Sequence, residues 1–419
     1  MNKTSALYPL FHLFFRGMML FFLIMQIFPP ANVFIHISPL LINLSFIGIA
    51  FVLFSSLLKS KTIIALLLYF ALCLLYFLAG SKFFYAIGTI VYPFQIMMGS
   101  VIISEYTFKY DDDYKLTKKL VLLVVVANIV MSIITIPQVL QSPNLIRWAT
   151  DPEFIEQMGT EYHWIITYST CHGLPLLIAP LVFLCRRTFR KSTLWFCVWT
   201  LVTVSLLYMI YLSNATTPLV IAVIMFALGS LLNWERISKR DCLLIAAGAF
   251  VVLILNTQSV MLTLLDSIQS VMDEESSNYQ KINEFKDELL YGSSEGDWSA
   301  RKNLYNKSWF LFIDSPIIGT AHQEDIAHHS WFIDRLACFG ILFIAPVVLV
   351  FFFHIKSIYR HLIYSKVPYI ISVSAWLLML VLKNDFGQGS WLYGFAFLPI
   401  FCRYIDFFVM KQQLKRRNI

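Results

Sequence analysis

The sequence predicts an all-α, polytopic membrane protein with about twelve transmembrane helices. Of its 419 residues, 58% are hydrophobic and only 14% are charged, and the mean hydropathy is +0.70. Successive apolar runs of roughly 18–25 residues are each long enough to cross a ~30 Å hydrocarbon core as a helix. Runs such as residues 120–136 do not alternate in polarity, so they do not fit the short strands of a transmembrane barrel.

The predicted spans follow these apolar runs in order. The first run, between Pro9 and Pro30, is too long for the apolar region of a signal peptide and has no small-residue cleavage site. We therefore interpret it as a retained span. The predicted spans are residues 9–29, 33–57, 62–80, 84–104, 120–138, 164–184, 193–212, 217–234, 242–256, 331–354, 367–383 and 391–410.

The basic residues indicate on which side of the membrane each connection lies. Every second connection is rich in Lys and Arg, namely residues 59–61, 109–119, 186–191, 236–240, 356–366 and the tail 411–417. The positive-inside rule predicts that these connections and both termini are cytoplasmic. The same anchors account for the formal net charge of +7, so the charge does not indicate a nucleic-acid partner.

Two of the other connections are long, and we predict that both lie on the outer, periplasmic side. They are residues 139–163 and 257–330. The longer one begins with an amphipathic acidic stretch, residues 260–290, which predicts one or two helices, and continues with a helix at 298–312 near the membrane interface. The expected parts are residues 1–256 with spans one to nine, residues 257–330 as a large periplasmic loop, and residues 331–419 with spans ten to twelve and a basic cytoplasmic tail.

An acidic run stands in one of the short cytoplasmic connections. Asp111, Asp112 and Asp113 lie between Lys109 and Lys115, with no soluble catalytic domain attached. We interpret the run as a solvated charge cluster rather than as a metal site for a nucleotide sugar.

Three arginines fall on the outer side, where the positive-inside rule disfavours them. They are Arg147, Arg301 and Arg335. A guanidinium is permanently charged and can hold two phosphate oxygens through parallel hydrogen bonds, so an anionic, lipid-linked substrate would explain their presence. A salt bridge to loop acids such as Glu295 and Asp297 is the alternative explanation for Arg301.

Two histidines and an aspartate complete the candidate site. His329 stands just before the tenth span and can exchange a proton near neutral pH; the alternative is that it caps the following helix. His328 points to another side, so it is a weaker candidate. His172 lies in the sixth span beside Gly173, which permits close helix approach. Asp385 lies in the last outer loop.

Neither the histidines nor the cysteines form a metal-binding pattern. His322 lies six residues before His328, without the carboxylates of a metal site. The cysteines lie in or beside apolar spans and form no Cys-x-x-Cys pair; they are Cys73, Cys171, Cys185, Cys197, Cys242, Cys338 and Cys402. We expect them to be small buried residues, and we expect no metal and no cofactor.

Residues 301–340 resemble the shared core of the O-antigen ligase and polymerase superfamily. The matching features are Arg301 opening a loop helix, the Pro-x-x-Gly turn of Pro316 and Gly319, the pair His329-Ser330, and Gly340. The predicted topology is similar along the whole chain. One feature differs: many relatives carry an arginine near the turn between spans seven and eight, where residues 213–218 contain no basic residue. Arg147 is our candidate replacement.

The resemblance implies a GT-C-like glycosyltransferase of the bacterial inner membrane, with its active site facing the periplasm. His-Ser followed by an aromatic residue and Ile333-Asp334 looks most similar to the Wzy-type O-antigen polymerases. The implied partners are an undecaprenyl-diphosphate-linked oligosaccharide donor and acceptor, the lipid bilayer and a chain-length regulator protein. Together with the candidates found above, the predicted catalytic residues are His329 and Arg301, and the predicted substrate-binding residues are Arg147, Arg335, His172 and Asp385.

Two other functions stay open at the level of sequence. A ligase of the same superfamily would transfer the finished glycan to lipid A core. A flippase or exporter would move the lipid-linked unit across the membrane; such carriers commonly show repeated halves, and this sequence shows no internal repeat.

Overall fold

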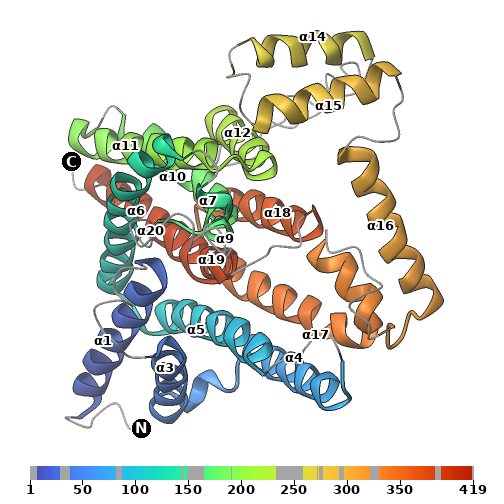
Figure 1. Cartoon of the computed structure of the whole chain (residues 1–419). Helices are drawn as coiled ribbons and strands as arrows, with labels where there is room; N and C mark the ends of the chain where they lie inside the picture. The colour runs from blue at the N-terminus through green and yellow to red at the C-terminus, as the bar shows by residue number, and fades with distance from the viewer. Residues whose placement is uncertain are drawn as a thin grey trace.

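The computed structural model is a bundle of helices with a smaller helical group beside it (Figure 1). It describes residues 7–28, 38–81, 87–142, 145–148, 165–189, 191–232, 258–270, 272, 277–291, 297–320, 330–382 and 388–417. In these ranges every regular element is a helix, in agreement with the predicted all-α class. The ninth predicted span, residues 242–256, lies outside the described residues.

The helices follow the order of the predicted spans. In the first half of the chain they are α1 (Leu7–Ile27), α3 (Pro39–Leu53), the 3₁₀ turn η1 (Ser55–Leu57), α4 (Lys61–Leu78), α5 (Gly88–Tyr110), α6 (Lys115–Gln141), α7 (Leu145–Trp148), α9 (Tyr168–Gly173), α10 (Pro175–Thr188), α11 (Thr193–Leu212) and α12 (Thr216–Leu231). The remaining helices are α14 (Gln258–Gln269), α15 (Ser277–Tyr291), α16 (Asp297–Asp314), α17 (Trp331–His361), α18 (Lys366–Leu382), α19 (Gln388–Leu392), the π-helical turn η5 (Tyr393–Phe397) and α20 (Leu398–Arg417).

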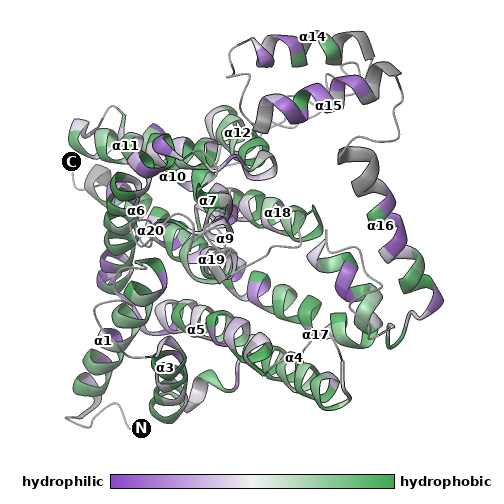
Figure 2. Cartoon of the chain, in the orientation of Figure 1, coloured by the Kyte–Doolittle hydropathy of each residue, from purple (hydrophilic) through white to green (hydrophobic). Residues whose placement is uncertain are grey.

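Length and composition indicate which of these helices can cross a membrane. Within the described ranges, six are long and apolar enough: Pro9–Ile27, Lys61–Leu78, Lys115–Gln141, Thr193–Leu212, Trp331–His361 and Gly389–Leu414. Three shorter apolar helices are Pro39–Leu53, Thr217–Leu231 and Lys366–Leu382. Figure 2 shows that the bundle is mostly apolar, whereas α14 and α15 carry many polar residues. These features indicate an integral, multi-pass membrane protein; twelve spans and the cytoplasmic placement of the termini stay predictions.

Two predicted spans are interrupted, which their apolar patterns do not reveal. The sixth is divided at Leu174 into α9 and α10, and Pro175, which has no backbone N–H, begins α10. The twelfth contains the π-helical turn η5 between α19 and α20. The Tyr393 hydroxyl in that turn donates to the side-chain oxygen of Asn128 in α6 at 2.9 Å. The two interruptions leave α9 and α19 as short helices that pack against each other.

The interpretation of the acidic run as uniformly solvated was wrong. The Asp111 side chain is fully buried and accepts hydrogen bonds from the backbone N–H groups of Leu116 and Thr117, at 2.9 and 2.7 Å. It therefore satisfies free N–H groups at the start of α6, a role that the residue type permits but the charge run conceals. Asp113 is exposed, and the Lys115 ammonium at 2.8 Å lowers the pKa of that carboxyl to about 2.

The cysteines are free thiols at the six described positions. Cys73, Cys171, Cys338 and Cys402 are buried as expected, whereas Cys185 is half-buried and Cys197 is exposed on α11. The expectation of burial was wrong at Cys197, because an apolar run does not distinguish the positions of a span that face the protein from those that face lipid. Cys242 lies outside the described residues.

The loop between spans nine and ten contains two antiparallel polar helices and a third long helix. α14 and α15 form the pair expected from residues 260–290, and α16 matches the helix expected at 298–312. Lys286 of α15 forms an ion pair with Asp266 of α14 and donates to the Gln269 side chain at 2.7 Å. Figure 1 shows the α14–α15 pair at the top of the view, apart from the bundle, and α16 leading back toward α17.

Candidate functional site

Asp334 is a buried carboxylate that joins α16 to the start of α17. Its Oδ1 accepts a hydrogen bond from the Ser308 hydroxyl of α16 at 2.7 Å, and its Oδ2 accepts one from the Ser330 N–H at 2.8 Å. All three residues are fully buried. A buried carboxylate destabilises a fold unless its oxygens are hydrogen-bonded, and here both are. The position of α16 relative to α17 is therefore held by specific bonds.

Ser330 is the N-cap of α17. Its hydroxyl accepts a hydrogen bond from the Ile333 N–H at 3.1 Å, as an N-cap serine does. The alternative role considered for His329, that of a helix cap, is thus filled by its neighbour. His329 itself lies outside the described residues, as does His328.

α17 is interrupted at Gly340, and the turn that follows α16 fills the interruption. The backbone of Gly340 has φ 65° and ψ −169°, which no helix permits. The Ile341 N–H, released by the break, donates to the carbonyl of Pro316 at 2.9 Å. The Leu342 N–H donates to the carbonyl of Ile317 at 3.1 Å. The turn thereby supplies acceptors for N–H groups that would otherwise be buried without partners.

The turn after α16 crosses the break in α17 at close range, and we call this contact the crossing. It requires both glycines of the matching pattern. Gly319 has φ 70° and Gly340 has φ 65°, the region that favours glycine. A Cβ on Gly319 would lie 2.2 Å from the carbonyl carbon of Cys338, and one on Gly340 would lie 2.3 Å from the carbonyl oxygen of Ile317. The Pro-x-x-Gly turn and the later glycine are therefore two halves of one backbone contact, which sets the geometry of the α16–α17 junction.

Replacing Gly340 with alanine is expected to destabilise the protein severely. The left-handed backbone costs a non-glycine residue on the order of 1–3 kcal/mol, and the contact with Ile317 backbone adds to this. The measurement is the yield of monodisperse protein and its thermal unfolding midpoint. Gly48→Ala in α3 is the matched control, since its Cβ would meet nothing within 4 Å and alanine favours a helix by roughly 0.5–1 kcal/mol. Equal midpoints for the two variants would contradict the role assigned to the crossing.

Arg335 lies one residue after Asp334 and faces aromatic side chains. Its guanidinium lies 4.1 Å from the ring centroid of Trp331 and donates to the Trp331 carbonyl at 3.1 Å. α17 also packs against α4. The Trp331 ring in turn meets the Trp391 ring of α19 edge to face, with centroids 5.3 Å apart. Arg335 is therefore held at the junction of α17, α4 and α19.

His172 is buried where two short helices make close contact. Its Nδ1 lies 2.9 Å from the Tyr168 carbonyl, and its ring meets the Tyr168 ring edge to face. α9 packs against α19, and the Ser390 hydroxyl donates to the Ser169 carbonyl at 3.2 Å. A Cβ on Gly173 would lie 2.8 Å from the Tyr393 ring. The predicted close approach at Gly173 is confirmed.

Within the described structure, only some of the helices that carry the candidate residues contact one another. α7, which contains Arg147, packs against α9, and α9 packs against α19, close together in Figure 1. Arg335 approaches the same α19 through Trp331. Arg301 lies on α16, which Asp334 joins to α17. The side chains of Arg147 and Arg301 are not described, and Asp385 lies outside the described residues, so their roles stay predictions.

Sequence reasoning missed three contributors to the junction. Ser308 shows no sequence signal, because nothing distinguishes it from other hydroxyls on α16. Asp334 stands four residues after the N-cap, one residue beyond the capping-box spacing, so the sequence pattern did not indicate its bond to the Ser330 N–H. The Tyr76 hydroxyl of α4 donates to the carbonyls of Ile318 and Phe339, both at 3.0 Å. It therefore bonds to both segments of the crossing.

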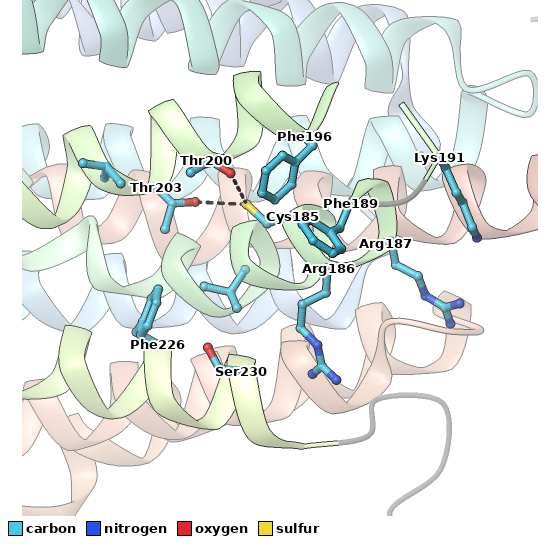
Figure 3. A pocket seen from close by; sticks show the side chains of 12 residues that line it. Cys185, Arg186, Arg187, Phe189, Lys191, Phe196, Thr200, Thr203, Phe226 and Ser230 are labelled. Atoms are coloured by element: carbon cyan, nitrogen blue, oxygen red, sulfur yellow. Dashed lines mark hydrogen bonds between the residues drawn. The ribbon is translucent and has the colours of Figure 1, made fainter. Parts of the chain in front are cut away.

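A separate cavity of about 770 Å³ lies among α10, α11 and α12 and contains none of the candidate residues (Figure 3). Thr200 and Thr203 contact the Cys185 thiol at 3.8 and 3.7 Å. Arg186, at its edge, donates to the Leu232 carbonyl at 2.8 Å and so satisfies the end of α12. In the part of the chain that the structure describes, no three His, Cys, Asp or Glu side chains are close enough to hold a metal ion.

The fold and the junction define an integral membrane protein in which helix α16 is fixed against an interrupted apolar helix, α17. Residues 201–341 match the family described as O-Antigen ligase. The match begins in α11 and ends just after Gly340, so it includes α16, the turn and the interrupted start of α17. The resemblance inferred from residues 301–340 is confirmed over this stretch. Enzymes of the family transfer lipid-linked glycans, and the family does not separate polymerases from ligases. No curated protein matches the chain.

Proposed function

We propose that the chain is a polymerase of lipid-linked polysaccharide repeat units in the bacterial inner membrane. It would transfer the growing glycan from undecaprenyl diphosphate to a hydroxyl of the next lipid-linked unit on the periplasmic face. The observation that supports this proposal is the family match over the stretch that forms the α16–α17 junction. In the transfer, the bond between the anomeric carbon and the diphosphate breaks. A glycosidic bond forms to the acceptor oxygen, whose proton must be removed.

The position of Arg301 on α16 agrees with contact to a substrate beside α17. Arg301 precedes Ser308 by seven residues, and a helix returns to nearly the same face after seven residues. Ser308 bonds to Asp334, and the Tyr305 hydroxyl on the same face donates to the Leu382 carbonyl of α18 at 2.9 Å. The helical repeat therefore supports our proposal that Arg301 belongs to the face of α16 that meets the bundle.

Each candidate residue has a role in the proposed transfer. Arg301 and Arg147 would neutralise charge that develops on the departing diphosphate, so no metal is demanded. His329 would accept the proton of the acceptor hydroxyl or orient that hydroxyl. Arg335, His172 and Asp385 would contact the diphosphate or the glycan around them.

A ligase that transfers the finished glycan to lipid A core is the second candidate, because the matching family is described by that activity. The bond chemistry is the same, and only the acceptor differs. A flippase or exporter would form no glycosidic bond, so it is distinguishable by products alone.

Purified protein given lipid-linked repeat units alone is expected to form a ladder of longer glycans on undecaprenyl diphosphate. The measurement is the size distribution of glycan released from the lipid, with and without added lipid A core. Products that appear only on lipid A core would assign the chain to the ligases. Passage of the unit across a vesicle membrane without new glycosidic bonds would assign it to the exporters.

A further inference from the structure

A second, polar cavity of about 530 Å³ lies where α4 begins and where α5 and α17 end. Five cationic side chains line it: Lys59, Lys61, Lys109, Lys356 and Arg360. Among its described lining residues Glu105 is the one carboxylate, and that side chain accepts a hydrogen bond from the Ser60 hydroxyl at 2.9 Å. The lining thus carries five positive charges against one negative charge.

These five cations differ from other basic side chains at the same end of the bundle. Arg403 donates to the Asp111 carbonyl at 2.7 Å, and Lys115 pairs with Asp113 at 2.8 Å. Over the described ranges, no ion pair joins any of the five to a carboxylate. The positive-inside rule explains why basic residues gather on this side. It does not explain why three separate segments direct their cations into one cavity.

The cavity is distinct from the candidate transfer site. Lys61 begins α4 at the cavity. Tyr76, near the other end of α4, bonds to the backbone on both sides of the crossing at Gly340. Lys61 and Tyr76 are separated by 15 residues of α4, so at 1.5 Å per residue the two places are about 22 Å apart along its axis. A ligand in the cavity would therefore occupy a second site.

Like charges gathered in a cavity repel one another, and a bound anion removes that repulsion. Ammonium and guanidinium groups bind phosphate oxygens through charge-assisted hydrogen bonds, and the first N–H groups of α4 favour an anion at the same place. The hydroxyls of Thr62 and Ser357 are further polar groups in the lining. We propose that this cavity binds an anionic phosphate group, remote from the transfer site. The phosphate belongs to the headgroup of an anionic lipid or to a free diphosphate, since both present the same oxygens.

Binding is measured on the purified full chain with two probes. Sodium diphosphate is titrated in neutral detergent while the thermal unfolding midpoint is followed. Retention of phosphatidylglycerol against phosphatidylcholine is measured by native mass spectrometry after extraction from mixed-lipid nanodiscs. The test variant is Lys109→Gln with Lys356→Gln, which removes two cations from different segments of the cavity. The control is Lys119→Gln with Lys411→Gln, which makes the same change in charge at exposed positions outside the lining.

Wild type and control are expected to bind one of the probes, and the test variant at least about tenfold more weakly. A midpoint raised by diphosphate in wild type and control alone assigns the site to a soluble phosphate. Selective retention of phosphatidylglycerol by the same two proteins assigns it to a lipid headgroup. Equal behaviour of test and control variants with both probes would overturn the proposal, as would the absence of binding by wild type.

Discussion

Replacing Arg301 with alanine is expected to abolish long-chain glycan while the protein still reaches the membrane. In the proposed transfer this guanidinium stabilises charge on the departing diphosphate, and removing one such donor lowers the rate roughly 10²–10³-fold. A loss of that size, repeated at every addition, would leave only single units or very short chains. The measurement is a gel of polysaccharide extracted from cells that carry the variant, with membrane content checked by immunoblot.

Two further variants separate the function of Arg301 from general effects on α16. Arg301→Lys is also expected to fail, because an ammonium cannot reproduce the paired hydrogen bonds of a guanidinium. Lys307→Ala removes an exposed charge from the same helix and is expected to leave the chain ladder unchanged. A normal ladder from Arg301→Ala would remove this residue from the mechanism.

The helices could be predicted from the sequence because long apolar runs separated by basic connections are a strong signal. α6 and α11 fall on the predicted spans 120–138 and 193–212. The interruption of α17 at Gly340 could not be predicted in the same way. A glycine within an apolar run is compatible with a helix, and the acceptors for the released N–H groups lie in the turn at Pro316, far back in the chain. Only tertiary packing brings the two together.

In the candidate site, too, the sequence could indicate some residues but not the bonds that depend on tertiary packing. Arg301 could be proposed because the positive-inside rule disfavours an arginine on the outer side, and His329 because a histidine can exchange a proton near neutral pH. The bond between Ser308 and Asp334 could not, since it joins two helices whose relative position the sequence pattern does not contain. Asp111 shows the opposite case: a residue assigned to solvent is buried, and its carboxylate accepts hydrogen bonds from N–H groups in the first turn of α6.

His329→Ala is expected to lose most polymer formation, whereas His328→Ala should lose little. A general base contributes roughly 10²–10⁴ in rate, enough to eliminate long chains. Consecutive side chains point in different directions both in a helix and in an extended segment, so only one of the pair can face a common substrate. The measurement is the rate of glycan elongation by purified variants with lipid-linked repeat units. Equal activity of the two alanine variants would exclude His329 as the base.

The structure supplies a sharper control for His329 than its neighbour does. Ser330 is the residue whose hydroxyl caps α17, and losing such a cap costs roughly 1 kcal/mol of stability. Ser330→Ala should therefore lower the unfolding midpoint while elongation continues. His329→Ala should lose elongation while the unfolding midpoint stays unchanged. If both variants lose stability and activity in proportion, His329 has a structural role only. Running the same assay with EDTA tests the arginines as well, because loss of wild-type activity on chelation would show that a metal performs the charge stabilisation assigned to Arg301.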